Sequence, residues 1–266
     1  GAGVAANGGN GFTGSLDGRD HMINGLRINR GSNGFGYGLF GVVGAGGLLT
    51  AIGLDAANVT GGGDVGALVG RNAGTVRFAR VGGSVTGLTA TGGLVGTNLA
   101  GGTITDSYSI ATVSGPLQQA SNLGGFVGEN YGGIARAYAR GAVSGFIYAG
   151  GFAGRNAGAI DQVYATGQVT GGNSGGLIGF SDSGSSLSNS FWDTAATGQG
   201  FARGSTSSNA GAQGLTTAQF QDSQAFATLA RAWNFRTVWA PPSAGYYPEF
   251  YRWSRVLTII PDAVSR

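Results

Sequence analysis

A glycine-rich unit occurs six times in this sequence and constrains the fold more than any other feature. The first copy reads Gly-Leu-Phe-Gly, and the others have the form Gly-X-apolar-apolar-Gly, where X is Ala or Gly. The closing glycines are Gly41, Gly70, Gly96, Gly128, Gly154 and Gly179, separated by 29, 26, 32, 26 and 25 residues. A period of about 20 to 50 residues is typical of solenoids, propellers and repeat arrays.

Residues outside the glycine unit repeat at constant distances as well. Asparagine follows the closing glycine by two residues in four copies: Asn72, Asn98, Asn130 and Asn156. Four copies end in Val-Ser-Gly or Val-Thr-Gly, with Val85, Val113, Val143 and Val169. Five residues earlier stand Arg80, Tyr108, Tyr138 and Tyr164, and four residues before those stand Val76, Ile104, Ile134 and Ile160. The sixth copy keeps this spacing with Leu187 and Phe191. The repeated element is therefore a whole unit of about 26 residues.

The segments between the glycines have the period of β-strands. Apolar and small polar residues alternate in them, as in TITDSYSIATV (103–113). One such unit cannot bury its own apolar face, whereas stacked copies place equivalent residues above one another. Parallel crossover connections are right-handed. The sequence therefore predicts an all-β protein, a right-handed parallel β-helix with coils of about 26 residues.

Stacking predicts columns of equivalent side chains. One inward column is expected to contain Leu68, Leu94, Phe126, Phe152 and Leu177. A second inward column is expected to contain Tyr108, Tyr138, Tyr164 and Phe191. The repeated asparagines are expected to form an amide ladder at a turn, because Asn tolerates a left-handed backbone and bonds to its neighbours.

A further apolar column lies directly beside the first one in sequence. It consists of Phe40, Val69, Val95, Val127, Ala153 and Ile178. Neighbouring residues of a flat strand point to opposite faces. The column is therefore expected either near a corner, where both residues can be buried, or on an outer face covered by the C-terminal segment or another chain. An exposed stripe of this length would mark an interaction surface.

The composition excludes several classes of protein. Glycine accounts for 56 of 266 residues, yet 41% are hydrophobic and only 10% are charged, which is the opposite of a disordered chain. All 15 basic residues are scattered arginines, so no cluster can neutralise neighbouring phosphates and we expect no nucleic-acid binding. The absence of cysteine excludes disulfides and thiolate metal sites. No apolar run approaches the length of a membrane span, so we expect no membrane insertion.

We divide the chain into three parts. Residues 1–37 form a first coil, in which 11–29 have a strand, Asp-Gly turn, strand pattern; residues 38–198 form the repeat solenoid; residues 199–266 form a C-terminal cap. The opening GAGVAANGGNG has neither an initiator Met nor a secretory pattern, which favours a processed or excised piece. The insertion Pro116–Asn122 is expected to bulge at one corner, as a neutral loop or a partner contact.

The repeated units resemble the GLUG-type repeat of large bacterial surface and secreted proteins. These include filamentous-haemagglutinin-like adhesins, two-partner-secretion exoproteins, and the non-catalytic part of some immunoglobulin-A metallopeptidases. FTGSLDGRDHMINGLRI resembles the coil that precedes such repeats, and FWDTAATGQG, GLTTAQF, WNFRTVW and GYYPEFYRW resemble the segment that follows them. The resemblance implies an extracellular or bacterial cell-surface location and does not fix an activity.

The C-terminal part differs from the repeats in composition. All four tryptophans, Trp192, Trp233, Trp239 and Trp253, lie beyond Phe191. GLTTAQFQDSQAFATLARAW is the one convincing helical stretch, with Thr216 or Thr217 as its N-cap, and FRTVW and YYPEFYRW are expected to be short strands. Since the end of a solenoid exposes an unpaired edge, we interpret this part as a cap. A carbohydrate platform built from the aromatic residues is the alternative.

Residues able to do chemistry are few. Glycoside hydrolysis needs two carboxylates across a cleft. Asp106 and Asp161 come nearest to alignment but differ by one residue in register, which would put them on opposite strand faces. Asp17 and Asp20 flank a turn, and the single histidine, His21, cannot build a zinc site without further ligands. We therefore expect no catalytic, metal or cofactor site.

Two further patterns suggest surface features rather than ligand loops. GGGDVG lacks the lysine of a phosphate-binding loop, and calcium-binding nonapeptide repeats would need an Asp in every turn. Arg71, Glu129 and Arg155 share a position beside the asparagines and are expected to form a solvated charge column.

The sequence thus favours a non-enzymatic scaffold of a bacterial surface or secreted protein. It would present loops on a stiff rod to host-cell or surface glycans or proteins. The alternatives are a carbohydrate-active β-helix enzyme that uses dispersed Asp residues, and an extracellular protein that assembles with itself end to end or through the apolar stripe.

Overall fold

A computed structural model describes residues 11–254 and divides the chain into two compact units, Gly1–Leu215 and Thr216–Arg266. The beginning of the predicted first coil, residues 1–10, and the end of the predicted cap, residues 255–266, lie outside the described residues. Within residues 11–254, no helix combines the length and the apolar character needed to cross a membrane.

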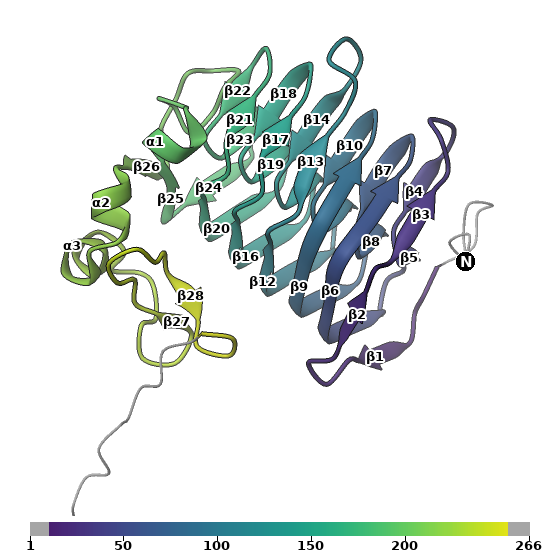
Figure 1. Cartoon of the computed structure of the whole chain (residues 1–266), viewed down its shortest axis with the longest axis horizontal. Coiled ribbons are helices and arrows are strands. Elements are labelled where there is room, and N and C mark those ends of the chain that lie inside the picture. Colours follow the sequence, from purple (N-terminus) through teal and green to yellow (C-terminus); the bar gives the residue numbers. More distant parts are fainter. Residues whose placement is uncertain (1–10, 255–266) are drawn as a thin grey trace, which may run out of the picture. The chain divides into compact units, whose positions relative to one another are not determined.

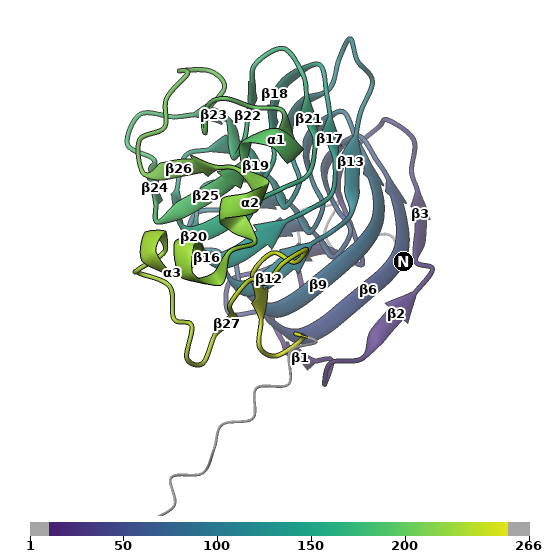
Figure 2. The ribbon, with the colours of Figure 1, turned by 60° about the vertical axis from the view of Figure 1, so that its left-hand side comes forward.

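The first unit is a stack of coils, each of which contributes strands in turn to three parallel sheets (Figures 1 and 2). Sheet 1 contains β1 (Ser15–Asp17), β2 (Met22–Asn24), β3 (Arg27–Asn29), β6 (Leu48–Thr60), β9 (Thr75–Thr86), β12 (Thr103–Ser109), β13 (Thr112–Ser114), β16 (Gly133–Ala139), β17 (Val143–Ser144), β20 (Ala159–Ala165), β21 (Val169–Thr170), β24 (Ser186–Ser188), β25 (Ser190–Asp193) and β26 (Ala212–Leu215). Sheet 2 contains β4 (Phe35–Tyr37), β7 (Gly63–Gly66), β10 (Thr89–Gly92), β14 (Ser121–Gly124), β18 (Ile147–Gly150) and β22 (Ser174–Gly175). Sheet 3 contains β5 (Phe40–Val43), β8 (Val69–Asn72), β11 (Val95–Asn98), β15 (Val127–Asn130), β19 (Ala153–Asn156) and β23 (Ile178–Ser181).

The strand register follows the sequence repeat. Ile104 pairs with Ile134, Tyr108 with Tyr138, Val113 with Val143, and Asn98 with Asn130. Every pairing between coils in these three sheets is parallel, for example β12 with β16 and β10 with β14. The predicted parallel β-solenoid is therefore confirmed.

Strands outside the six repeated units extend the stack at both ends. The strands β1, β2 and β3 pair in parallel with β6, so the segment 11–29 extends sheet 1 at this end. At the other end β26 pairs in parallel with β25. The solenoid therefore continues to Leu215, beyond the end that we predicted at residue 198.

The core lies inside the coils and contains both apolar columns. Leu68, Leu94, Phe126, Phe152 and Leu177 are fully buried, as predicted. The second column, from Val69 to Ile178, is also fully buried and belongs to the same core, and Phe40 packs against it. The alternative with both residues near a corner is therefore correct, and this column does not form an exposed stripe.

The tyrosine column is on the opposite face from the one we predicted. The residues on either side of the tyrosines, such as Ser107 and Ser109, are buried, and a Cβ atom added at Gly125 would lie 3.0 Å from the Cβ of Ala139. Side chains alternate along a strand, so Tyr108, Tyr138 and Tyr164 lie on the outer face of sheet 1, where Tyr138 and Tyr164 are themselves buried but do not belong to the inner core. Their rings stack at 4.7 and 4.9 Å.

Residues with a left-handed backbone conformation explain why the tyrosines face outward. In successive coils of sheet 1, one such residue stands two positions before the outward one: Ala51, Phe78, Asp106, Arg136, Gln162 and Asn189. Ile104 and Tyr108 are separated by four residues and would share a face in a regular strand. The left-handed Asp106 between them, with φ of 51°, breaks the alternation so that Tyr108 turns outward.

The predicted asparagine ladder and its bonds between neighbours are confirmed, but the left-handed backbone that we expected is not found. The Nδ2 atoms of Asn72, Asn98 and Asn130 each donate to the Oδ1 atom of the asparagine in the next coil at 2.8 Å, and all four side chains are buried. None of the four has a positive φ. The ladder is built by internal amide bonds, which satisfy one another inside the stack.

The glycines of the repeated unit allow two backbones to approach each other. A Cβ atom at Gly92 would lie 2.6 Å from the N atom of Gly128, and one at Gly96 would lie 2.5 Å from the N atom of Val65. Both neighbours are backbone atoms of sheets 3 and 2, so they cannot move aside as a side chain can. Glycine has a structural use here and does not form a ligand loop.

The second unit has its own aromatic core. It contains α2 (Thr217–Phe220), α3 (Ser223–Leu229) and the antiparallel pair β27 (Trp239–Ala240) and β28 (Glu249–Phe250). The predicted helical stretch is thus two short helices, with Thr216 as the N-cap of the first and Asp222 as that of the second. A helix that we did not predict, α1 (Thr194–Thr197), follows β25 and belongs to the first unit.

Candidate functional site

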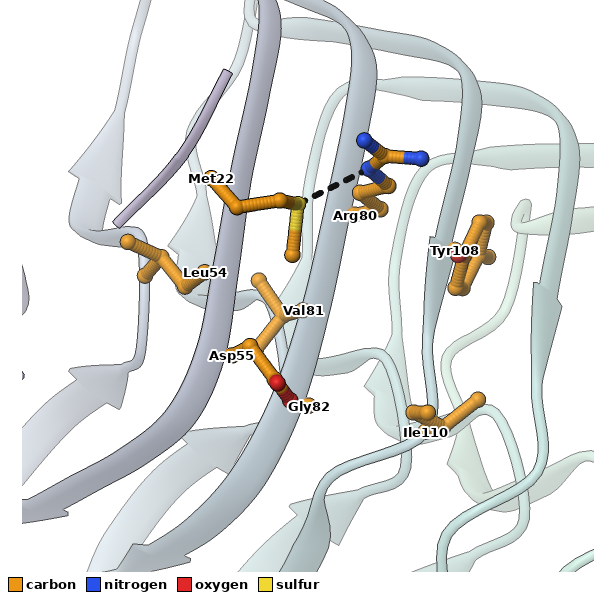
Figure 3. A pocket seen from close by; sticks show the side chains of 8 residues that line it. All are labelled: Met22, Leu54, Asp55, Arg80, Val81, Gly82, Tyr108 and Ile110. Atoms are coloured by element: carbon orange, nitrogen blue, oxygen red, sulfur yellow. Dashed lines mark hydrogen bonds between the residues drawn. The ribbon is translucent and has the colours of Figure 1, made fainter. Parts of the chain in front are cut away.

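A groove opens on the outer face of sheet 1, close to the first coil (Figure 3). Its volume is about 250 Å³. Its lining, which we call the Tyr108 groove, consists of Met22, Leu54, Asp55, Arg80, Val81, Gly82, Tyr108 and Ile110. These residues come from four successive coils, so the groove exists only because the coils stack.

A β-bulge shapes the middle of the groove. Between Leu54 and Ala57 the register shifts, so that two residues of β6 stand opposite one of β9. Ala56 takes a left-handed conformation, and its N–H donates to the Oδ1 atom of Asp55 at 2.9 Å. A Cβ atom at Gly82 would lie 3.2 Å from the Oδ1 atom of Asp55. The bulge and the missing side chain therefore turn the Asp55 carboxylate toward the groove.

Arg80 is held at one side by the first coil. Its Nε atom donates to the Sδ atom of Met22 and its Nη2 atom to the backbone oxygen of Asp20, both at 3.0 Å. In Figure 3, Arg80 and Met22 lie on one side of the opening, and Asp55 and Gly82 on the other. A cation and an anion thus face the same small space.

Tyr108 forms the end of the groove toward the later coils. Its ring is parallel to that of Tyr138 within 5°. Farther along, Arg140 lies over Tyr138, with 5.0 Å between its Cζ atom and the ring centre, and its Nε atom donates to the hydroxyl of Tyr164 at 3.1 Å. The tyrosine stack fixes the orientation of the Tyr108 ring.

The predicted charge column lies on sheet 3. Arg71, Glu129 and Arg155 occupy one column, with Thr97 between Arg71 and Glu129. Arg155 forms a two-pronged ion pair with Asp182 at 2.9 and 3.1 Å, and the hydroxyl of Tyr131 donates to Glu129 at 2.6 Å. Burial, with the Glu129 carboxylate adding to it, raises the pKa of Tyr131 to about 12. The column is therefore a bonded network rather than a row of separate solvated charges.

Asp64 is the anion at the start of this network. Its carboxylate accepts from the hydroxyl of Thr97, and the Nε atom of Arg71 lies 3.4 Å away. Burial raises the pKa of Asp64, although Thr97 and Arg71 act in the opposite direction. Because the proton is bound more tightly in the folded chain, this residue contributes stability below its unfolded pKa, and the contribution is lost as the pH rises through the folded pKa.

Replacing Asp64 by Asn is therefore expected to raise the thermal midpoint at pH 7 relative to the unmodified chain, because the neutral amide avoids the burial penalty of the carboxylate. The gain is expected to shrink toward pH 4, where the carboxyl group takes up its proton. Thermal unfolding at both pH values measures the difference, and Asp17→Asn at an exposed turn serves as the control. A gain that is constant or that grows toward low pH would contradict this explanation.

The two carboxylates that we considered for catalysis lie on one surface, not on opposite faces. Asp161 is one register position from Asp106, as predicted, because Thr105 pairs with Ala135 and Ala135 with Asp161. The left-handed conformation of Asp106 turns it to the same side. Arg136 binds Asp106 at 2.5 and 2.8 Å, and Asp161 accepts bonds from Ser188 and Asn189. Both carboxylates are thus engaged by neighbouring side chains.

The other residues singled out in the sequence have structural contacts. The side chain of His21 is exposed, and its backbone N–H donates to Gly18 in the predicted turn, where Asp17 also accepts from the N–H of Arg19. Trp192 is buried in the last coil, while the rings of Trp233 and Trp239 stack at 4.2 Å within the second unit and are buried. Among residues 11–254, no three His, Asp or Glu side chains gather as a metal site.

Sequence reasoning missed the Tyr108 groove. Its residues are spread from Met22 to Ile110, and their proximity depends on the bulge and on the outward direction of Tyr108. One sequence feature could have pointed to the groove: the repeat position that Tyr108 occupies is held by Arg80 in the preceding coil.

Known proteins share parts of this chain. Residues 87–114 match the family model described as the GLUG motif. Over 103 residues, or 39% of this chain, the sequence is 43% identical to halomucin from Haloquadratum walsbyi, and the match spans 1% of the length of that protein. A crystal structure described as a “putative immunoglobulin A1 protease” from Bacteroides ovatus superimposes with a TM-score of 0.65 and 23% identity, covering 88% of this chain and 76% of that one.

The structural likeness, at this identity, concerns the fold alone. The matched motif occupies one coil, and the other coils repeat its glycines and its strand pairings in register. The chain therefore contains a GLUG repeat region folded as a β-solenoid.

Proposed function

We propose that this chain is a non-enzymatic, adhesive segment of an extracellular or cell-surface protein. It presents its outer face and loops on a stacked solenoid for attachment to glycans or proteins. The filamentous-haemagglutinin-like character implied by the sequence resemblance belongs to this proposal. The GLUG motif and the similarity to halomucin support it.

One observation carries the proposal. The repeated residues serve the stack itself: the glycines allow backbone contact, the asparagines bond to one another, and the apolar columns fill the core. What differs from coil to coil lies on the outside, in the Tyr108 groove, the charge column, and the insertion that carries Leu117, whose exposed fraction is 65%. A constant interior with a variable exterior suits a rod that displays binding groups.

The experiment combines retention on a glycan array with a search for released saccharides. The full chain is expected to be retained on a subset of glycans and to release no product. Hydrolysis that disappears in Asp106→Asn or Asp161→Asn, while thermal unfolding is unchanged, would overturn the non-enzymatic proposal. Absence of retention on every glycan and on every surface protein tested would overturn the adhesive one.

A further inference from the structure

We infer that the Tyr108 groove binds one neutral hexopyranose unit of a glycan. This inference rests on the proposed attachment function and gives it a site and a ligand class. The groove lies on the outer face of sheet 1, where Met22 and Ile110 at its rim have exposed fractions of 37% and 49%.

The size of the groove suits a single small ring. Its volume of about 250 Å³ lies just below the range of about 300–1,000 Å³ that holds drug-sized ligands. One sugar ring is therefore the expected occupant, with the rest of the glycan outside.

The apolar part of the groove suits the C–H face of a sugar. Met22 and Ile110 flank the opening, while Leu54 and Val81 beneath it belong to the buried core. Tyr108 adds an aromatic ring whose orientation is fixed by its stack with Tyr138. Aromatic side chains supply large contact areas with few rotatable bonds, so little entropy is lost when a ligand packs against them.

The polar part of the groove selects a neutral ligand that both donates and accepts. The Oδ1 atom of Asp55 accepts from Ala56, and its second oxygen can accept a ligand hydroxyl. Arg80, on the other side, is a cation whose Nε and Nη2 atoms already donate to Met22 and Asp20. An anionic ligand would meet Asp55, a cationic one would meet Arg80, and a hydrocarbon would remove both charges from water without compensation. Sugar hydroxyls can donate to Asp55 and add no charge beside Arg80.

The polar groups are already fixed in position before a ligand binds. Arg80 is held by Met22 and Asp20, and Asp55 by its bond to the backbone of the bulge. Groups that need no further ordering lower the entropic cost of binding. The groove can therefore recognise a single ring with measurable affinity.

The test uses the full chain and saturation-transfer NMR, with titration calorimetry for ligands that bind. The probes are the methyl pyranosides of glucose, galactose and mannose, together with methyl glucuronide as an anion and glucosamine as a cation. At least one neutral glycoside is expected to bind more tightly than either charged probe. Tyr108→Ala is expected to weaken this binding at least about tenfold, Asp55→Asn to weaken it less, and Tyr108→Phe to preserve it because the ring remains.

The matched control is Leu117→Ala in the exposed insertion, which is expected to leave binding unchanged. Circular dichroism and thermal unfolding show whether each variant is folded, and Asp55→Asn tests the site if Tyr108→Ala is not. The inference is overturned if no neutral glycoside binds, if the charged probes bind more tightly, or if binding persists in both Tyr108→Ala and Asp55→Asn.

Retention on the glycan array separates this inference from the proposed function. If folded Tyr108→Ala is retained on the same glycans as the unmodified chain, the adhesive function stands and the groove assignment is wrong. If a neutral glycoside binds in the groove while the unmodified chain is retained on no glycan or protein surface, the groove assignment stands and the adhesive function is wrong.

Discussion

Replacing Gly92 by alanine is expected to prevent the solenoid from folding, or to destabilise it by more than about 4 kcal/mol. The added Cβ atom would lie 2.6 Å from the N atom of Gly128 and closer still to the backbone oxygen of Val95. Both neighbours belong to strands that are paired on two sides, β15 and β11, so neither can shift without breaking the stack. Far-UV circular dichroism and thermal unfolding measure the effect.

Gly133→Ala is the matched control. Gly133 lies in β16 of the same stack, a Cβ atom there would meet nothing within 4 Å, and Thr103 and Ala159 occupy its position in the adjacent coils. This change is expected to be neutral or to stabilise by up to about 1 kcal/mol, because alanine restricts the unfolded chain. Equal effects of the two substitutions would contradict the close-approach role of the repeated glycines.

Replacing Asn98 by valine is expected to destabilise the solenoid by about 2–6 kcal/mol, because it removes one ladder hydrogen bond from each of two buried neighbours at about 1–3 kcal/mol each. The Nδ2 atom of Asn72 loses its acceptor, and the Oδ1 atom of Asn130 loses its donor. Denaturant unfolding measures the loss.

Two further valine substitutions test the ladder itself. Asn72→Val is expected to cost less than Asn98→Val, because Asn72 stands at the end of the ladder, where Val43 already occupies the equivalent position in the first coil. Asn58→Val, at an exposed position of β6, is expected to change stability by less than about 0.5 kcal/mol. If Asn72→Val and Asn98→Val cost the same, the ladder does not act through its amide bonds.

The stack could be predicted from the sequence because the period of the repeat is also the register of the sheet. Once Asn98 and Asn130 are known to be equivalent, their pairing follows, and so do the buried positions of Leu94 and Phe126. No propensity argument was needed. In a solenoid, a constant spacing along the chain becomes a constant position in space.

The direction of the tyrosines could not be predicted, because it depends on single residues with left-handed backbone. Phe78 and Arg136 adopt positive φ although L-residues of these types rarely do so, and Asp106 adopts it as well. The pairing of strands above and below imposes this conformation, and no local sequence signal marks it. The error about Tyr108 and the error about the faces of Asp106 and Asp161 have this one cause.

The candidate site could not be predicted for a related reason. The groove depends on the bulge at Asp55 and Ala56, on the absence of a side chain at Gly82, and on the outward direction of the Tyr108 ring. The outward turn recurs from coil to coil, whereas the bulge is a departure from the repeat. A search for what repeats therefore finds the architecture, whereas the groove lies where the repeat is broken.

Deleting one whole coil, residues 125–150, tests most directly the claim that the repeated residues form a stack of equivalent coils. The deletion joins Gly124 to Gly151, and since Gly124 pairs with Gly150, the register of all three sheets is kept. Asn98 would meet Asn156, and Tyr108 would meet Tyr164. We predict that thermal unfolding of this shortened chain, followed by far-UV circular dichroism, shows the same β spectrum and a cooperative transition, whereas deletion of 125–137 alone abolishes both. An unfolded chain after removal of the whole coil, or a folded one after removal of half, would contradict the account.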